Sequence, residues 1–134
     1  MKSEETRALI DDFYKTLSKG DRAHLLELLA EDVEWQMPAS IPDGIWRGRE
    51  KVANELGADT VRRLFQRGTF RLTIYNIYVD GNIAIVQTGT EAITKAGNVY
   101  KMEYAWIYTC KNHQISHIRE YLDTRSAAQM LGWD

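Results

Sequence analysis

The stretch that decides the fold is VYKMEYAWIYTCKNHQISHIREYLD, residues 99–123. Two runs of strand-forming side chains flank the turn segment KNHQ, which predicts a long β-hairpin. Because strand side chains alternate between two faces, the first arm gathers its largest side chains on one face: Tyr100, Met102, Tyr104, Trp106 and Tyr108. This aromatic wall is either part of the core or the lining of a pocket, and the sequence leaves both interpretations open.

The second arm of the hairpin carries a carboxyl group in an unusual position. Glu120 shares its face with Ile118 and Leu122, so it points toward apolar surroundings. A carboxylate in such a place needs either an ionic partner or a chemical role. The sequence offers both accounts, an ion pair with Arg47 or Arg49 and a catalytic function.

Length and charge limit the class of protein. The chain has 134 residues and 44% hydrophobic content, which suits a single domain over residues 1–134 with a core that can hold a pocket. The formal net charge is only -2 and the two signs are interspersed, so we expect no nucleic-acid partner. No apolar run approaches the roughly 20 residues of a membrane span. A local group of arginines is interpreted as a solvated face that nearby Glu55 and Asp59 balance: Arg62, Arg63, Arg67 and Arg71.

Cysteine and histidine content argues for chemistry without a cofactor. Cys110 is the only cysteine, so no intrachain disulfide can form, and the N-terminal segment MKSEETR lacks the apolar run of a signal peptide. These features predict a reducing cytoplasm. His113 and His117 stand about 13 Å apart along a strand, too far to share one metal ion. Glycine-rich nucleotide motifs are also absent, and we expect neither a metal nor a cofactor.

Helical patterns precede strand patterns along the chain. Apolar spacing and caps predict helices over residues 3–19, from residue 21, and over 49–67 with a disturbance at 57–59. A short strand is predicted at 33–37, followed by a loop over 39–47 that forms a pocket rim. Strands follow at 70–79 and 83–94 and in the hairpin, and the tail 124–134 forms one helical turn. This order predicts an α+β fold with helices on one face of an antiparallel sheet.

Several motifs together resemble a known superfamily. DDFYKTLSKGD, LLELLAEDVEWQMP, WRGREKV, GNIAIVQTGTEA and QISHIREYLD are similar to the nuclear-transport-factor-like superfamily, specifically its SnoaL-like and ketosteroid-isomerase-like members. The resemblance runs from about residue 5 to residue 124. It implies a cone-shaped, cystatin-like α+β barrel in which a curved sheet and helices enclose an apolar pocket, usually in a homodimer. It does not imply one reaction, since this fold hosts isomerases, hydrolases, cyclases, dehydratases and non-catalytic proteins.

The resemblance carries over to individual residues unevenly. Met37 stands where ketosteroid isomerase has a catalytic aspartate, Trp106 stands near its oxyanion-hole aspartate, and Tyr14 matches its tyrosine. Glu120 and Glu91 resemble the acidic positions of limonene-epoxide-hydrolase relatives, whereas Gly89 replaces their arginine.

The sequence leads to the hypothesis of a carboxylate pair. We expect Glu91 and Glu120 at the same end of the pocket, with open space beside Gly89. Within about 6 Å of each other in an apolar setting, they would share a proton near neutral pH. The remaining predicted lining residues are apolar or amide side chains: Trp35, Met37, Gln87, Met102, Tyr104, Trp106 and Ile118.

Two functions are compatible with these residues. The first is a cofactor-free acid/base enzyme acting on a small, largely apolar metabolite, with Glu120, Glu91 and Tyr14 as catalytic residues. The second is a homodimer that binds or scaffolds a small molecule without turnover. The mixed polarity of the outer sheet face predicts the dimer contact there, near His117, Arg119 and Tyr121.

Overall fold

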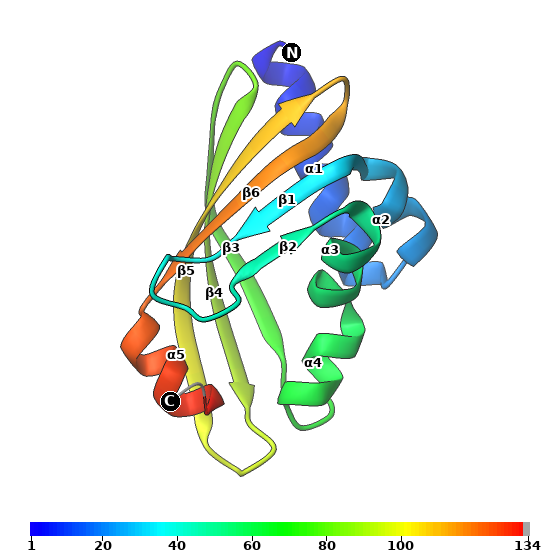
Figure 1. Ribbon diagram of the computed structural model, residues 1–134. Coiled ribbons are helices and arrows are strands. Elements are labelled where there is room, and N and C mark those ends of the chain that lie inside the picture. Colours follow the sequence, from blue (N-terminus) through cyan, green and yellow to red (C-terminus); the bar gives the residue numbers. More distant parts are fainter. Residues whose placement is uncertain (133–134) are drawn as a thin grey trace.

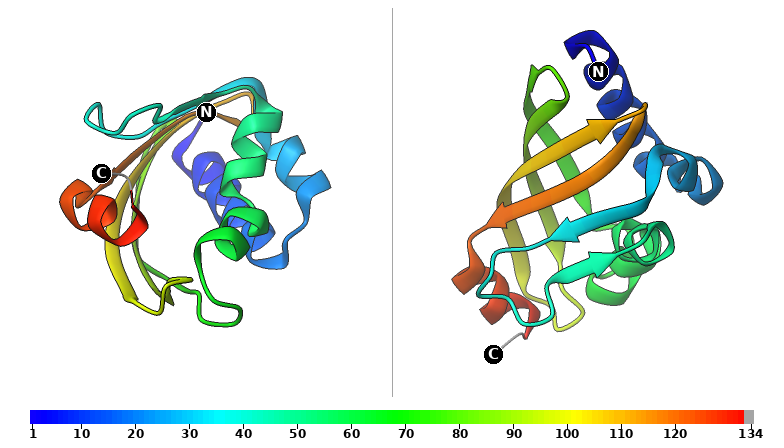
Figure 2. Two further views of the ribbon diagram at one scale, coloured as in Figure 1. Left: turned by 60° about the horizontal axis from the view of Figure 1, so that its bottom comes forward. Right: turned by 45° about the horizontal axis from the view of Figure 1, so that its top comes forward.

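The chain folds into one strongly curved six-stranded sheet with four helices against its concave side (Figures 1 and 2). The computed structural model describes residues 1–132. The strand order is β2-β1-β6-β5-β4-β3. In chain order the elements are α1 (Ser3–Lys19), α2 (Arg22–Leu28), β1 (Leu29–Gln36), β2 (Ile45–Arg47), α3 (Arg49–Leu56), α4 (Ala58–Leu64), β3 (Arg71–Asp80), β4 (Ile83–Ile93), β5 (Val99–Lys111), β6 (Gln114–Leu122) and α5 (Thr124–Leu131). The predicted α+β class and cone shape are confirmed.

The helices begin and end close to the predicted positions. α1 ends at Gly20, whose φ of 68° is the left-handed conformation that glycine adopts most easily. Asp21 caps α2 by accepting a hydrogen bond from the backbone N–H of His24 at 3.1 Å. The predicted disturbance at residue 57 is confirmed as the break between α3 and α4. Among residues 1–132, no helix has the length and apolar character needed to cross a membrane.

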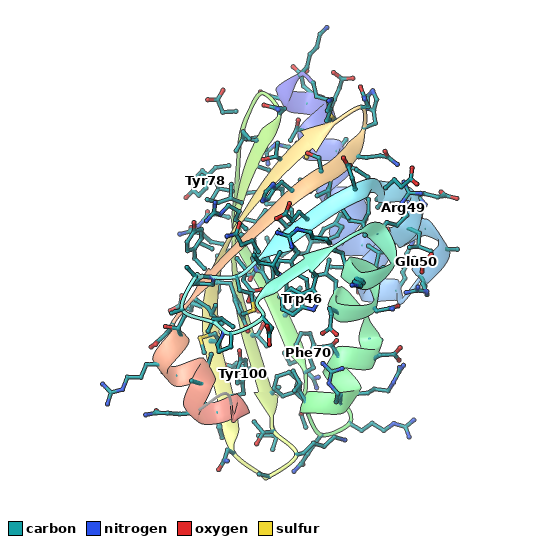
Figure 3. The ribbon with its side chains drawn as sticks, viewed as in Figure 1. Trp46, Arg49, Glu50, Phe70, Tyr78 and Tyr100 are labelled. Carbon is teal, nitrogen blue, oxygen red and sulfur yellow. The ribbon has the colours of Figure 1, made fainter. Side chains whose placement is uncertain are left out.

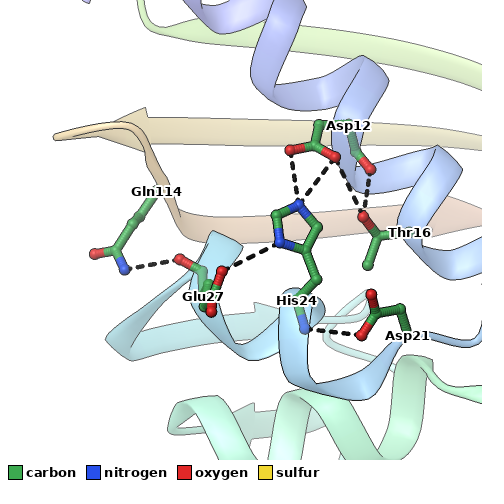
Figure 4. Close-up of polar contacts among 6 residues, drawn as sticks. All are labelled: Asp12, Thr16, Asp21, His24, Glu27 and Gln114. Carbon is green, nitrogen blue, oxygen red and sulfur yellow. Dashed lines mark hydrogen bonds and ion pairs between the residues drawn. The ribbon is translucent and has the colours of Figure 1, made fainter.

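A histidine ties the first two helices together (Figure 4). The two ring nitrogens of His24 on α2 contact Asp12 on α1 at 2.9 Å and Glu27 at 3.2 Å. These two hydrogen bonds, the one to Asp12 first, raise the pKa of His24. The cluster is partly solvent-exposed, so we assign it a structural role in linking α1 to α2.

The sheet contains the predicted meander and one connection that the sequence did not reveal. β3, β4, β5 and β6 pair antiparallel in sequence order, and Asn112 and His113 both have positive φ in the turn of the predicted hairpin. β1 pairs parallel with β6, so the sheet is mixed and not wholly antiparallel. Part of the predicted loop 39–47 forms β2, where Ile45–Arg47 pairs antiparallel with β1. The tail forms α5, which is longer than the predicted single turn; residues 133–134 lie outside the described part.

The aromatic wall faces the helices. On β5, Tyr108 is opposite Ala84 on one side and Ile118 on the other, and all three are buried. They belong to the main core with α1 side chains such as Phe13. A second buried cluster includes Met102 on β5 and Ala127 on α5. It packs α5 against the N-terminal end of β5.

We predict that Ile118→Ala lowers the free energy of unfolding by about 2–5 kcal/mol, because Ile118 is fully buried between β1 and β5. Chemical denaturation measures this change. The control is Val99→Ala, which truncates a side chain that is 65% exposed and should cost much less. Equal losses for both variants would contradict the placement of the core.

Candidate active site

A cavity of about 400 Å³ lies between the concave face of the sheet and helices α1, α3 and α4. This volume suits a small organic molecule. Ten of the fourteen aromatic residues in the chain line it, which makes its walls flat and polarisable. Strands β1, β2 and β5 supply most of these rings: Trp35, Trp46, Tyr100, Tyr104, Trp106 and Tyr108. In Figure 3, Trp46 and Phe70 lie between the sheet and the helices, whereas Tyr78 lies on the other side of the sheet.

Glu120 is the one ionisable carboxyl group buried in the cavity wall, among the residues that the structure describes. It lies on the inner face of β6 opposite Trp106 and is 5% exposed. Trp35 donates a hydrogen bond from its indole Nε1 to Glu120 Oε1 at 3.0 Å. Burial raises the pKa of Glu120 to about 8, and the Trp35 hydrogen bond opposes part of that rise. At pH 7 the neutral form of Glu120 is therefore the more populated one.

Two pairs of tyrosine hydroxyl groups lie in the same cavity. Tyr14 on α1 and Tyr108 on β5 share a hydrogen bond of 2.6 Å, and Tyr100 and Tyr104 form a similar pair further along β5. Burial raises the pKa of all four phenols, that of Tyr100 to about 12, and the charge of Glu120 raises them further. Within each pair one hydroxyl donates its hydrogen bond to the other. The second hydroxyl can therefore donate its own O–H to a ligand oxygen.

The indoles are held by one another and by Thr88. Trp35 stacks on Trp46 with ring centroids 4.3 Å apart and planes 28° apart. Trp106 donates a hydrogen bond from Nε1 to Thr88 Oγ1 at 3.1 Å. The sequence reasoning did not select Thr88 or Phe70 for the cavity. Counting the period-2 alternation along β4 from Ala84 would have placed Thr88 on the inner face.

The predicted carboxylate pair is wrong. Glu91 is in register with Lys101 on the outer face of the sheet, where the two side chains form an ion pair of 3.5 Å and Glu91 is 64% exposed. Glu120 lies on the inner face, so the sheet separates the two carboxyl groups. The predicted open space beside Gly89 is filled by Tyr75, because a Cβ on Gly89 would meet the Tyr75 hydroxyl.

Three predicted lining residues lie elsewhere. Gln87 projects from the outer face, where it accepts a hydrogen bond from Asn76 at 3.1 Å, so that prediction is wrong. Met102 and Ile118 point inward but are buried in the packing around Ala127 and in the main core. The other predicted residues line the cavity as expected: Tyr14, Trp35, Met37, Tyr104, Trp106 and Glu120.

The alternative of a loop arginine paired with Glu120 is also wrong. Arg47 pairs with Glu34 at 3.6 Å on the outside of β1, and Arg49 donates from Nε to the backbone oxygen of Leu29 at 3.0 Å. The charged groups that line the cavity besides Glu120 are Asp43, Glu55 and Arg63, of which the last two form an ion pair of 3.3 Å at the helical rim. The predicted balancing of the arginines by acidic neighbours is confirmed there and at the Arg62–Asp59 pair.

Comparison with known proteins assigns the family. The sequence pattern of the SnoaL-like domain matches residues 10–118. The chain belongs to the SnoaL-like family. No protein of curated function matches this SnoaL-like chain. Among residues 1–132, no three histidine, cysteine, aspartate or glutamate side chains are arranged to hold a metal ion.

Solved structures that are similar to this SnoaL-like protein share its fold across almost the whole chain. An NTF2-like protein from Burkholderia xenovorans is 23% identical with a TM-score of 0.82, covering 98% of each chain. TerC co-crystallised with polyporic acid is 19% identical with a TM-score of 0.78, covering 96% of this chain and 98% of TerC. An LEH-like epoxide hydrolase from Mycobacterium tuberculosis is 18% identical with a TM-score of 0.72, covering 96% of this chain and 90% of that one.

We predict that the free energy of unfolding of the wild type falls as pH rises from the pKa of Glu120 in the unfolded chain to its pKa in the folded protein. The unfolded chain loses the Glu120 proton near pH 4.5, whereas the folded protein keeps it up to about 8. Folding therefore loses on the order of 4 kcal/mol between these two values. Urea denaturation from about pH 5 to pH 8 measures this slope. Glu120→Gln stays neutral and still accepts a hydrogen bond from Trp35, so the stability of this variant should change much less with pH. The same slope in the variant and the wild type would show that Glu120 titrates normally.

Proposed function

We propose that this SnoaL-like protein is a cofactor-free acid/base enzyme that moves a proton on a small, conjugated carbonyl compound. The observation that carries the proposal is Glu120, a buried carboxyl group with a pKa of about 8 in an aromatic cavity. A pKa near the working pH allows one group to act as base in its ionised form and as acid in its protonated form.

The polar groups of the cavity favour a ligand with acceptor oxygens. The two tyrosine pairs keep their protons, and the neutral form of Glu120 adds a further O–H donor. Carbonyl oxygens accept such bonds, and a flat conjugated skeleton fits between aromatic walls. The co-crystallisation of TerC, which has a similar fold, with polyporic acid supports the choice of an aromatic ligand.

A single carboxyl group suits reactions in which the proton is returned. Ionised Glu120 takes a proton from a carbon next to a carbonyl, and the electron pair of the broken C–H bond moves onto the carbonyl oxygen to give an enolate. Tyrosine O–H groups stabilise that oxyanion by hydrogen bonds. Protonated Glu120 then gives the proton back at the same or another carbon, so no proton is consumed. Isomerisation or enolate-driven cyclisation follows from this cycle, because Glu120 is the buried carboxyl group of the cavity wall.

We predict that the protein catalyses exchange of hydrogen for deuterium next to the carbonyl of aryl ketones in D₂O, at a rate that rises with pH and levels off above about 8. NMR follows the loss of the proton signal without knowledge of the product. Glu120→Gln should slow the exchange about 100-fold or more. Glu91→Gln, which changes an exposed carboxylate on the outer face, should leave it unchanged.

The alternative of a binding protein is separated by the same assay. Polyporic acid serves as the first probe, and quenching of tryptophan fluorescence reports its binding because three indoles line the cavity. Binding without exchange for any ketone tested, and equal affinity in Glu120→Gln, would favour the non-catalytic function.

We also propose that two copies associate through the outer sheet face. A row of apolar side chains crosses that face at Tyr78, Ile85 and Ile107, and Tyr78 is 55% exposed. The row ends at Arg119 on β6, which is in register with Ile107, and His117 lies two residues before Arg119 on the same face. An exposed apolar row of this kind is typical of an interface.

We predict a mass of about twice 15.5 kDa by light scattering at micromolar concentration. Ile85→Asp should reduce it to that of one chain, because a carboxylate in the apolar row would be buried without a partner. Ala8→Asp adds the same charge on an exposed position of α1 and should leave the mass unchanged. A wild type of 15.5 kDa would overturn the proposal.

A further inference from the structure

We propose that Trp35 is a positioning residue, which holds one oxygen of the Glu120 carboxyl group and thereby presents the other oxygen, with the transferable proton, to the cavity. This inference rests on the proposed acid/base role of Glu120. It assigns to Trp35 a task beyond lining the cavity wall, and the task follows from one hydrogen bond and its chemistry.

The chemistry of indole decides which oxygen carries the proton. The Nε1–H of Trp35 can donate a hydrogen bond but cannot accept one. Its partner, Oε1 of Glu120 at 3.0 Å, must therefore act as an acceptor in both ionisation states. In a neutral carboxyl group the carbonyl oxygen is the stronger acceptor, so the bond from Trp35 favours Oε1 as the carbonyl oxygen and Oε2 as the oxygen that carries the proton.

The free oxygen faces the cavity. Glu120 belongs to the residues that line it. Among the described residues 1–132, the buried side-chain polar atom left without a hydrogen-bond partner is Nε2 of His117, on the outer face. Oε2 of Glu120 is therefore not sealed inside the protein without a partner. It opens toward the space where a ligand would lie.

Strand pairing keeps the indole in place. Trp35 on β1 is in register with Ile118 on β6, and Glu120 follows on the same face two residues later, as a diagonal neighbour. On its other side, Trp35 is in register with Trp46 on β2 and stacks against it. Trp35 is 7% exposed, so its donor has little freedom to turn away.

The surroundings make this hydrogen bond the main stabiliser of the ionised form. The titratable groups that face Glu120 are Tyr14 from α1 and three tyrosines of β5, all of which remain neutral. The rim carries Asp43 and the Glu55–Arg63 ion pair. A hydrogen bond to a carboxylate favours its ionised form, so loss of the Trp35 donor raises the pH at which Glu120 ionises.

A pair of matched variants tests the proposal. Trp35→Phe removes the donor and keeps an aromatic ring, and we expect the carboxyl-carbon NMR titration of Glu120 to move upward by about one to two pH units. The control is Trp106→Phe, which removes an indole from the same cavity whose Nε1–H donates to Thr88. We expect the control to move the midpoint much less. Equal shifts in both variants would overturn the proposal, since they would reflect packing alone.

The wild-type protein provides a test that does not depend on the folding of a variant. We expect the indole N–H proton signal of Trp35 to move with pH at the same midpoint as the Glu120 carboxyl carbon, and to stop moving in Glu120→Gln. A Trp35 signal that ignores the Glu120 titration would overturn the positioning role. Both readouts are independent of turnover, so absence of deuterium exchange would remove the proposed function and leave the Trp35–Glu120 coupling as a separate, measurable result.

Discussion

The parallel pairing of β1 with β6 is the constraint on which the rest of the structure depends. The two strands come from opposite ends of the chain, and α3, α4 and the β3–β4–β5 meander lie between them in sequence. Their register places Trp35 beside Ile118 and one step from Glu120. It also lets β2 add to the edge of the sheet, so that Trp46 covers Trp35. The cavity wall, the carboxyl group and its hydrogen-bond donor are therefore consequences of one pairing.

The protein separates its charges by face. Outside the sheet, carboxylates such as Glu91 and Glu34 have basic neighbours within 4 Å, and water screens these pairs so that each contributes little to stability. Inside, Glu120 has an indole donor and four phenols around it. Desolvation therefore has the largest effect on the pKa of Glu120, and the hydrogen bond from Trp35 opposes part of it.

The fold of this chain forms the cavity, but the fold alone does not fix its chemistry. By the sequence resemblance, Met37 matches and Trp106 lies near positions where ketosteroid isomerase has aspartates, and both residues line the cavity here. The buried carboxyl group is that of Glu120 on β6, which accepts a hydrogen bond from the indole of Trp35 on β1. The proposed function therefore assigns proton transfer to a different position of this fold, as is usual for folds that host many activities.

Much of this arrangement follows from local sequence pattern. Period-2 alternation over residues 99–123 determined the aromatic inner wall and the inward position of Glu120, because strand geometry fixes which side chains share a face. Capping residues and glycines determined the helix ends near Gly20, Asp21 and Gly57. β2 was hidden, since three residues within a proline-containing loop have too little pattern to mark a strand.

Relations between distant segments were decided only by the tertiary structure. Glu91 and Glu120 looked alike as acidic residues in strands, yet the pairing of β4 with β5 turned Glu91 outward to Lys101. No local signal linked Trp35 to Glu120, because the parallel register of β1 and β6 is set by how the whole cone closes. The sequence by itself determined that a carboxyl group would enter an aromatic interior. Long-range strand register alone decided that its partner would be an indole, because that register, and not the residues near Glu120, brings the donor within hydrogen-bond distance.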